Sequence, residues 1–256
     1  MAELRRVLIE PQRLRGCGQS FELTVKERHY LEKVLRIRPG SPFAIVDGQG
    51  ALHQAELQTG GLAQQGLCLE QQPPQQPELV LLLGLIRRDF DIVLRMACEL
   101  GVDQLIPLQA QRSVLDPGDK RQQRWESQLQ EACEQCERLW LPQLSPVISS
   151  IDQLSQSNAA GDLRCLAVTR EHEAPLLSEV LDGAGGVGRW QVACGPEGGW
   201  TPEERQTAAD HSWQPVSLGP SILRASTAAI SAVALMQHQR QPVSYTHLTL
   251  PTISSV

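Results

Sequence analysis

CGPEGGW, residues 194–200, follows the apolar run RWQVA and precedes TPEE, residues 201–204. In TPEE, Thr201 is typical of an N-cap, Pro202 of the first helical position and Glu204 of the third residue of a capping box. The pattern therefore predicts a strand, a tight turn and a helix in that order. LGPSILRAST, residues 218–227, repeats this arrangement and leads into a long apolar helical pattern.

Both turns carry a Gly-Pro pair at the expected carboxyl end of a strand. Ligands of open α/β sheets bind beyond these ends, and glycines let a ligand approach backbone N–H and C=O groups closely. Two such loops on neighbouring strands would form a pocket that grips a flat heterocycle. Two ordinary turns would give the same letters, so the pattern alone leaves both interpretations open.

Strand and helix patterns alternate over residues 79–242 and include a long helix over residues 120–140, which predicts an α/β fold with a mostly parallel sheet. Residues 1–70 instead contain short strands, a DGQG hairpin signal and an amphipathic helix over residues 24–37, which begins with a capping-box pattern of Thr24 and Glu27. The Pro/Gln-rich residues 71–78 are typical of a linker. Residues 243–256 do not continue the pattern, and we interpret them as a non-native or disordered tail; a genuine C-terminal strand is the alternative.

Composition narrows the class of protein. The chain has no apolar run long enough to span a membrane and no secretory signal, so we expect a cytoplasmic protein. The net charge of −6 argues against a general nucleic-acid binder. Arg and Lys nevertheless outnumber Asp and Glu up to Asp47, which favours a local polyanion contact or, alternatively, a solvated basic face.

Three further motifs predict no cofactor or metal. The seven cysteines are expected to be reduced thiols that pack as apolar residues, and Cys133 and Cys136 lack the second pair that a zinc site needs. GAGGVG, residues 183–188, matches a dinucleotide fingerprint but follows a helix and precedes a strand, so we interpret it as a loop. REHEAP, residues 170–175, has no second histidine nearby.

GPEGG followed by LGPSILR and a helix resembles the RsmE family of 16S rRNA (uracil-N3)-methyltransferases in the SPOUT superfamily. Three other segments resemble that family in the same order: KVLRIRPGSPFAIVDGQG, ACELGVDQLIPLQAQRSV and EACEQCERLWLPQL. The resemblance runs from about residue 4 to residue 242. It implies an N-terminal PUA-like β-barrel that binds RNA and a SPOUT domain with a C-terminal trefoil knot.

The resemblance also implies the reaction and its partners. S-adenosylmethionine (SAM) would be the cofactor, and N3 of one uridine in 16S rRNA of the small ribosomal subunit would be methylated. The chain would form a homodimer, with no membrane and no metal. The implied cofactor-binding residues are Thr169, Gly195, Pro196, Glu197, Gly198, Gly199, Leu218, Gly219, Ile222, Leu223, Arg224 and Thr227.

Two of these residues have candidate catalytic roles. Arg224 is a suitable fixed cation for the imide anion of uridine, and Glu197 is suited to act as a base or to bind the cofactor. The alternatives are an ion pair for Arg224 and a helix-dipole interaction for Glu197. The candidate RNA contacts are Arg5, Arg6, Arg28, His29, Arg36, Arg38, Arg87, Arg88 and Arg112.

The chain departs from the family pattern at three positions. Ser221 and Ser226 stand where many members have Arg and Glu, and Met96 stands where Lys is usual. These departures keep two alternatives open. One is a SPOUT methyltransferase that acts on another RNA, such as a tRNA base or ribose. The other is an RNA-binding or assembly factor that holds SAM without turnover.

Overall fold

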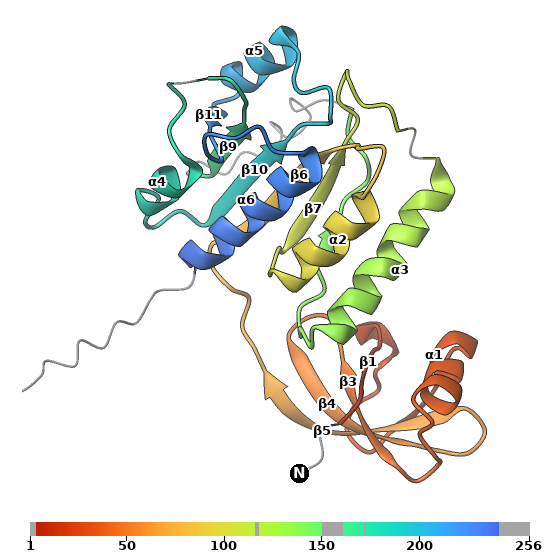
Figure 1. The fold of residues 1–256 in the computed structure, drawn as a ribbon. Helices are drawn as coiled ribbons and strands as arrows, with labels where there is room; N and C mark the ends of the chain where they lie inside the picture. Colours follow the sequence, from red (N-terminus) through yellow and green to blue (C-terminus); the bar gives the residue numbers. More distant parts are fainter. Residues whose placement is uncertain (1–3, 116–117, 150–160, 172, 241–256) are drawn as a thin grey trace, which may run out of the picture.

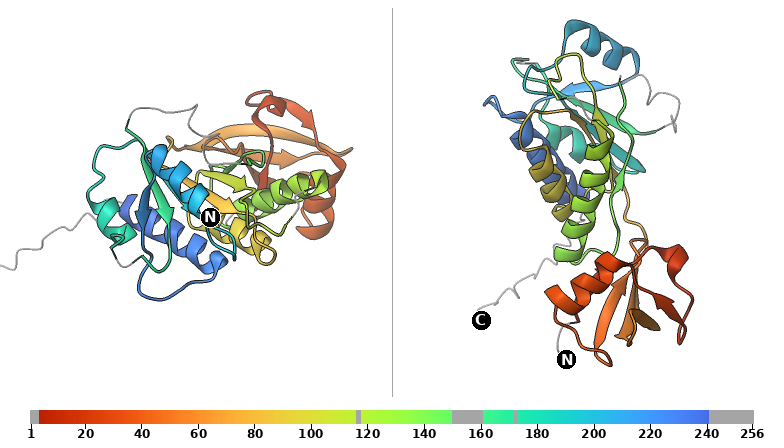
Figure 2. Two further views of the ribbon diagram at one scale, coloured as in Figure 1. Left: turned by 90° about the horizontal axis from the view of Figure 1, so that it is seen from above. Right: turned by 90° about the vertical axis from the view of Figure 1, so that its right-hand side faces the viewer.

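Two β-sheets organise the chain in a computed structural model, which describes residues 4–115, 118–149, 161–171 and 173–240 (Figure 1). The strands of the first sheet all come from the part of the chain before Gln72, and those of the second sheet begin at Glu78. In the side view of Figure 2 the helices and strands of the second part lie above the first sheet. The predicted tail, residues 243–256, lies outside the described residues. The exact division into domains stays a prediction.

The first sheet has the strand order β1-β3-β4-β5-β2. Its strands are β1 (Arg6–Leu8), β2 (Ser20–Glu22), β3 (Pro42–Val46), β4 (Ala51–Leu57) and β5 (Leu62–Gln71). β1 pairs with β3 in parallel and the other pairs are antiparallel. The hairpin predicted at DGQG is confirmed, and Asp47 Oδ1 accepts hydrogen bonds from Gln49 N and Ala51 N at 2.7 and 2.9 Å.

The helix predicted over residues 24–37 is shorter and changes type. α1 (Val25–His29) begins with the predicted capping box of Thr24 and Glu27, and a π-helical turn, η2 (Tyr30–Val34), follows it. A 3₁₀ turn, η1 (Pro11–Arg13), lies before β2. Leu31 of η2 packs with Phe43 and Ile45 in the core of the first sheet. Closure of this sheet into a barrel stays a prediction.

The second sheet has the order β11-β9-β10-β6-β7-β8, and every strand pair in it is parallel, as predicted. Its strands are β6 (Glu78–Gly84), β7 (Gln104–Leu108), β8 (Gln143–Leu144), β9 (Leu163–Ala167), β10 (Arg189–Cys194) and β11 (Gln214–Val216). The two-residue β8 was not predicted, because it is too short to show a periodic pattern. The residues of GAGGVG form the predicted connection between a helix and β10.

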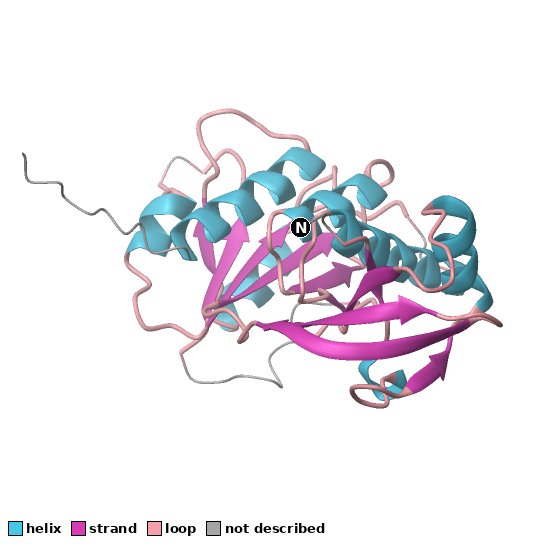
Figure 3. Ribbon diagram, turned by 90° about the horizontal axis from the view of Figure 1, so that it is seen from below, coloured by secondary structure: helices cyan, strands magenta, loops and turns pink. Residues whose placement is uncertain are grey.

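Helices cover both faces of the second sheet (Figure 3). They are α2 (Phe90–Glu99), α3 (Asp119–Gln135), α4 (Leu177–Asp182), α5 (Pro202–Asp210) and α6 (Ala225–Arg240). Because side chains alternate across a strand, Leu79 and Leu81 of β6 pack with residues of α2, α3 and α6, while Val80 packs with Ala208 of α5. α3 ends at Gln135, earlier than predicted, because Glu137 adopts a left-handed φ of 60° that a helix cannot continue.

The end of α3 fixes the first sheet to the second part. Leu8 N donates to Glu134 Oε1 at 2.8 Å, and Arg6 forms an ion pair with Glu137 at 2.8 Å. Burial raises the pKa of the Glu134 carboxyl, and the hydrogen bond from Leu8 opposes this shift. Gly50 N also donates to Leu139 O at 2.9 Å. A candidate RNA contact, Arg6, is therefore also part of this junction.

The cysteine prediction holds only in part. All seven cysteines are free, and Cys98, Cys133, Cys165 and Cys194 are buried as expected. Cys17 and Cys68 are exposed, so the prediction of apolar packing is wrong for these two.

Across the described ranges, no helix combines the length and apolar character that a membrane crossing requires.

The end of α6 is held by a buried ionic network. Asp103 Oδ2 accepts from Leu79 N at 2.9 Å and forms an ion pair with Arg240, whose side chain is 3% exposed. Asp103 Oδ1 contacts Arg138 Nη2 at 3.4 Å. Arg240 also donates to Gly101 O at 2.8 Å. The network joins α6 to the starts of β6 and β7 and to the segment after α3.

We expect Asp103→Ala to lower the free energy of unfolding by about 3 kcal/mol, because it leaves the buried Arg240 guanidinium without its counter-charge. Urea unfolding followed by circular dichroism measures the change. Asp103→Ala combined with Arg240→Met should recover part of the loss. An Asp103→Ala variant with the same free energy of unfolding as the parent protein would contradict the assigned role of this network.

Candidate functional site

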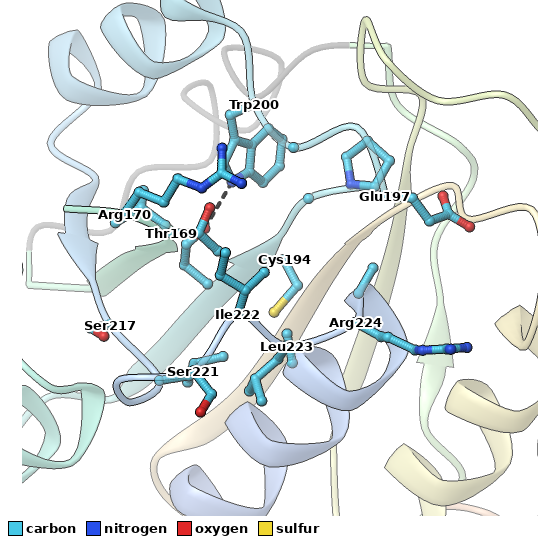
Figure 4. Close-up of a pocket in the computed structure, with 18 of the residues that line it drawn as sticks. Thr169, Arg170, Cys194, Glu197, Trp200, Ser217, Ser221, Ile222, Leu223 and Arg224 are labelled. Atoms are coloured by element: carbon cyan, nitrogen blue, oxygen red, sulfur yellow. Dashed lines mark hydrogen bonds between the residues drawn. The ribbon is translucent and has the colours of Figure 1, made fainter.

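A cavity of about 1160 Å³ lies at the carboxyl ends of β6, β9, β10 and β11 (Figure 4). Its walls are formed by residues 86, 88, 89, 167–171, 174–176, 194–200 and 217–226, at and after the ends of these strands, together with Arg112 from the segment after β7. Parallel strands bring these segments to one edge of the sheet, which is where ligands of α/β folds bind. Both loops singled out in the sequence therefore face one cavity.

Three hydrogen bonds from three other segments hold the loop after β10. Glu197 Oε1 accepts from Arg87 N at 2.9 Å. Arg112 Nη1 donates to Gly198 O at 2.9 Å and lies 3.4 Å from Trp200 O. Trp200 Nε1 donates to Ala167 O at 3.0 Å, the hydrogen bond beside Thr169 in Figure 4. Contacts with three other segments thus hold this loop in place.

Gly195 and Gly198 of this loop make room for protein atoms, and the expected role of the loop's glycines in ligand approach stays a prediction. A Cβ on Gly198 would lie 2.8 Å from Cβ of Arg112, and one on Gly195 would lie 3.0 Å from the Trp200 ring. A Cβ on Gly84 of β6 would lie 2.6 Å from Pro196. Gly219 differs: its φ is 125°, in a region that favours glycine, and no atom lies within 4 Å of its Cβ position.

The helix start that follows the first loop is confirmed. Thr201 and Glu204 form the predicted capping box, and Pro202 is the first residue of α5. Glu204 Oε1 also accepts from Gln111 N at 2.8 Å, which ties α5 to the segment after β7. The exposed Glu203 has a lowered pKa because backbone and Thr201 hydrogen bonds stabilise its carboxylate at the helix N-terminus.

The loop after β11 gives the cavity an apolar wall. Ile222 is 63% exposed and Leu176, before α4, is 41% exposed, and both line the cavity. Ser217 Oγ and Gly219 N lie 3.2 Å apart, in a hydrogen bond that closes the turn. Exposed aliphatic side chains at a cavity wall are suited to cover the face of a flat heterocycle.

Arg224 stands at the end of the second loop, directly before α6. Its carbonyl accepts from Ala228 N at 2.8 Å, and its side chain extends away from Ser221 to the side of the cavity on which Glu197 lies (Figure 4). No carboxylate among the described residues pairs with it, so the alternative of a structural ion pair finds no support there. A cation at the positive end of a helix is unfavourable for the helix itself, which points to a role toward a ligand.

Other charged groups and one thiol complete the lining. Arg88 and Asp89 line the cavity from the segment after β6, and Arg205 of α5 pairs with Glu171 on the opposite side. Burial raises the pKa of the Cys194 thiol to about 12. Cys194 is therefore protonated at neutral pH and is no nucleophile for covalent catalysis.

The cavity collects nearly all of the predicted cofactor residues. Of that set, Thr227 alone is absent from the lining; it is exposed on α6. The sequence interpretation did not assign Trp200, Arg170, Leu176 and Ile86 to the site. Trp200 could have been found from the sequence, because it is an aromatic residue directly after GPEGG in the turn between β10 and α5.

The predicted RNA contacts fall into two groups. Arg88 and Arg112 line the cavity, and Arg87 follows the same strand as Arg88. Arg5, Arg6, Arg28, His29, Arg36 and Arg38 belong to the first part of the chain, and all except the half-buried Arg6 are exposed. Arg28 pairs with Glu32 at 3.0 Å within its helix. Contact of either group with RNA stays a prediction.

Comparison with known proteins agrees with this geometry. A family model described as an RNA methyltransferase domain matches residues 73–237. A Synechocystis protein named Ribosomal RNA small subunit methyltransferase E is 33% identical over 232 residues, which cover 90% of this chain and 76% of that protein. A Mycobacterium bovis protein of the same name is 31% identical over 220 residues, 82% of each chain.

Solved structures give the same fold. The crystal structure of a Ribosomal RNA small subunit methyltransferase E from Neisseria gonorrhoeae, bound to S-adenosyl methionine, is 27% identical with a TM-score of 0.79 and covers 92% of this chain and 98% of that one. The family model spans most of the chain and the Synechocystis relative is aligned over nine-tenths of it. The chain therefore belongs to the ribosomal RNA small subunit methyltransferase E (RsmE) family.

Proposed function

We propose that the protein transfers a methyl group from SAM to N3 of one uridine in 16S rRNA of the small ribosomal subunit. The observation that carries this proposal is the cavity between the loops after β10 and β11, with apolar walls at one side and Arg224 at the other. Membership of the RsmE family supports the reaction, and the family relatives named above support the substrate class.

The residues of the cavity fit SAM. Backbone groups of the loops around Gly195 and Gly219 are suited to bind its polar adenine edge, and Ile222 and Leu176 are suited to cover the ring faces. The carboxylates that line the cavity, among them Glu179, offer partners for its positive charges. When bound, SAM supplies a methyl group that its sulfonium already activates, so the proposed transfer requires no metal.

The side chains on the Arg224 side must act on the uridine. Its N3 carries a proton and becomes a good nucleophile only as that proton leaves. Glu197 and Asp89 are carboxylates in reach of this side of the cavity, and Arg224 is the cation that would stabilise the resulting imide anion. Cys194 stays protonated, which favours direct attack by N3 over a covalent adduct on the base.

The wider assembly is part of the proposal. The exposed basic residues of the first part, such as Arg36 and Arg38, would bind rRNA phosphates beside the target. We further propose a homodimer that acts in the cytoplasm, where its ribosomal substrate is made. Ser221 and Ser226 line the cavity, so the alternative of a SAM-binding assembly factor without turnover deserves a direct test.

The test offers the protein labelled SAM with unmethylated small subunits or with their extracted RNA. We expect a single 3-methyluridine in 16S rRNA, mapped by nuclease digestion and mass spectrometry. Methyl transfer to a tRNA instead would support the first alternative. Calorimetric binding of SAM without transfer to any RNA would support the assembly factor.

We expect Arg224→Ala to lower kcat about a hundredfold while the Kd for SAM changes little, because the lost interaction exists only as charge develops on the uracil. Arg224→Lys should retain part of kcat, since it keeps the positive charge. Single-turnover kinetics and calorimetry measure the two quantities. Equal losses in kcat and SAM affinity would make Arg224 a cofactor-binding or structural residue.

Two substitutions separate the roles of Glu197. Glu197 Oε1 accepts a hydrogen bond from Arg87 N at 2.9 Å. A Gln side chain keeps an acceptor oxygen at this position but cannot act as a base. We expect Glu197→Gln to retain most of kcat and Glu197→Ala to lose about tenfold, because the hydrogen bond positions two loops. A loss in Glu197→Gln of a hundredfold or more, with unchanged SAM affinity, would instead identify Glu197 as the base.

A further inference from the structure

A second, smaller cavity of about 370 Å³ lies between the first turn of α2 and the first half of α3. These two helices lie side by side in Figure 1. The lining residues are Ile86, Arg87, Asp89, Phe90, Asp91, Ile92, Leu115, Arg121, Arg124 and Trp125. Ile86 and Asp89 also line the large cavity, so the two cavities share a wall.

Two consecutive arginines of the shared wall line different cavities. Arg88 lines the large cavity and Arg87 lines the small one. Asp89, the next residue, adopts a left-handed φ of 65°, an uncommon conformation that Asp tolerates better than most residues. The hydrogen bond from Arg87 N to Glu197 holds this wall against the loop after β10. The position of the small cavity is thus fixed relative to the proposed methyl-transfer site.

The floor of the small cavity is apolar. Phe90 and Trp125 pack with ring centroids 4.4 Å apart and are buried. Ile92 is 45% exposed, and Leu115 is half-buried above the same core. Since the two rings are covered, Ile92 and Leu115 are the apolar surface that the face of one heterocyclic base would contact.

The rim is basic. Arg124 pairs with Asp91, and among the described side chains that line the cavity Asp89 is the one further carboxylate beside Arg87 and Arg121. Both arginines are exposed, and within the described part of the chain neither forms an ion pair. Exposed guanidinium groups without carboxylate partners match the geometry and charge of a phosphodiester.

We propose that the small cavity binds a nucleotide of the RNA that neighbours the target uridine, with its base on the floor and its phosphate at Arg87 and Arg121. The proposal rests on the proposed function, since it places this nucleotide beside the one that is methylated. It adds Arg121 to the RNA-binding surface. Arg121 was not a candidate on the sequence, where it is one charge in a polar helical pattern.

The test compares Arg121→Ala with Arg95→Ala, a matched control. Arg95 is an exposed arginine of α2 that pairs with Glu99 and lines neither cavity. Binding of each variant to extracted 16S rRNA is measured by filter retention over a range of salt concentrations. We expect Arg121→Ala to weaken binding about tenfold and to lower the slope of log K against log salt by about one. Arg121→Lys should restore the slope, and SAM affinity should not change.

Two results would overturn the proposal. One is an Arg121→Ala variant whose RNA affinity and salt slope equal those of Arg95→Ala. The other is a change of sedimentation in Arg121→Ala, because this would make the surface an interface between copies of the chain. Failure of the parent protein to methylate any RNA would contradict the proposed function instead, while the binding comparison still decides on the small cavity.

Discussion

The site depends on one constraint: the loop after β10 is held from three directions. Arg87 N, the Arg112 guanidinium and Ala167 O come from segments after β6, β7 and β9, and each forms a hydrogen bond with residues 197–200. Such an arrangement needs strands that end at one edge, and a parallel sheet provides it. Protein contacts from three segments thus fix the conformation of this loop.

The neighbouring loop after β11 is held at its start, where Ser217 N donates to Pro175 O at 2.8 Å and Ser217 O accepts from Leu177 N at 2.9 Å. A short serine-glycine turn defines its conformation, and its Ile222 side chain is largely exposed. The two walls of the cavity therefore differ physically: one is fixed by contacts with protein, and the other offers apolar surface that a ligand can cover. Arg224 lies where the second loop meets α6, so its position depends on the helix as much as on the loop.

Much of this could be predicted from the sequence. The capping boxes at Thr24 and Thr201, the hairpin at Asp47 and the alternation of strands with helices all depend on local patterns, and all are confirmed. Contacts between segments that are far apart in the chain could not be predicted from the sequence. That Gly198 makes room for Arg112, or that Arg87 N meets Glu197, depends on which segments the sheet order brings together.

The errors have the same origin. Cys17 and Cys68 were expected to pack and are exposed, because composition does not fix the burial of a single residue. The predicted helix over residues 120–140 extends beyond the end of α3 at Gln135, because the left-handed φ of Glu137 cannot be read from helical periodicity.

The helix α6 has Arg224 directly before its first residue and the buried Arg240 as its last. With a rise of about 1.5 Å per residue, the 16 residues of α6 span about 24 Å, and a shift of one end of a rigid helix also moves the other end. A genetic screen for lost methylation would therefore recover substitutions around Asp103 and Arg240, at the opposite edge of the sheet from the cavity. Such alleles would look like distant regulatory sites, although they would only report that the helix that follows Arg224 had lost its anchor.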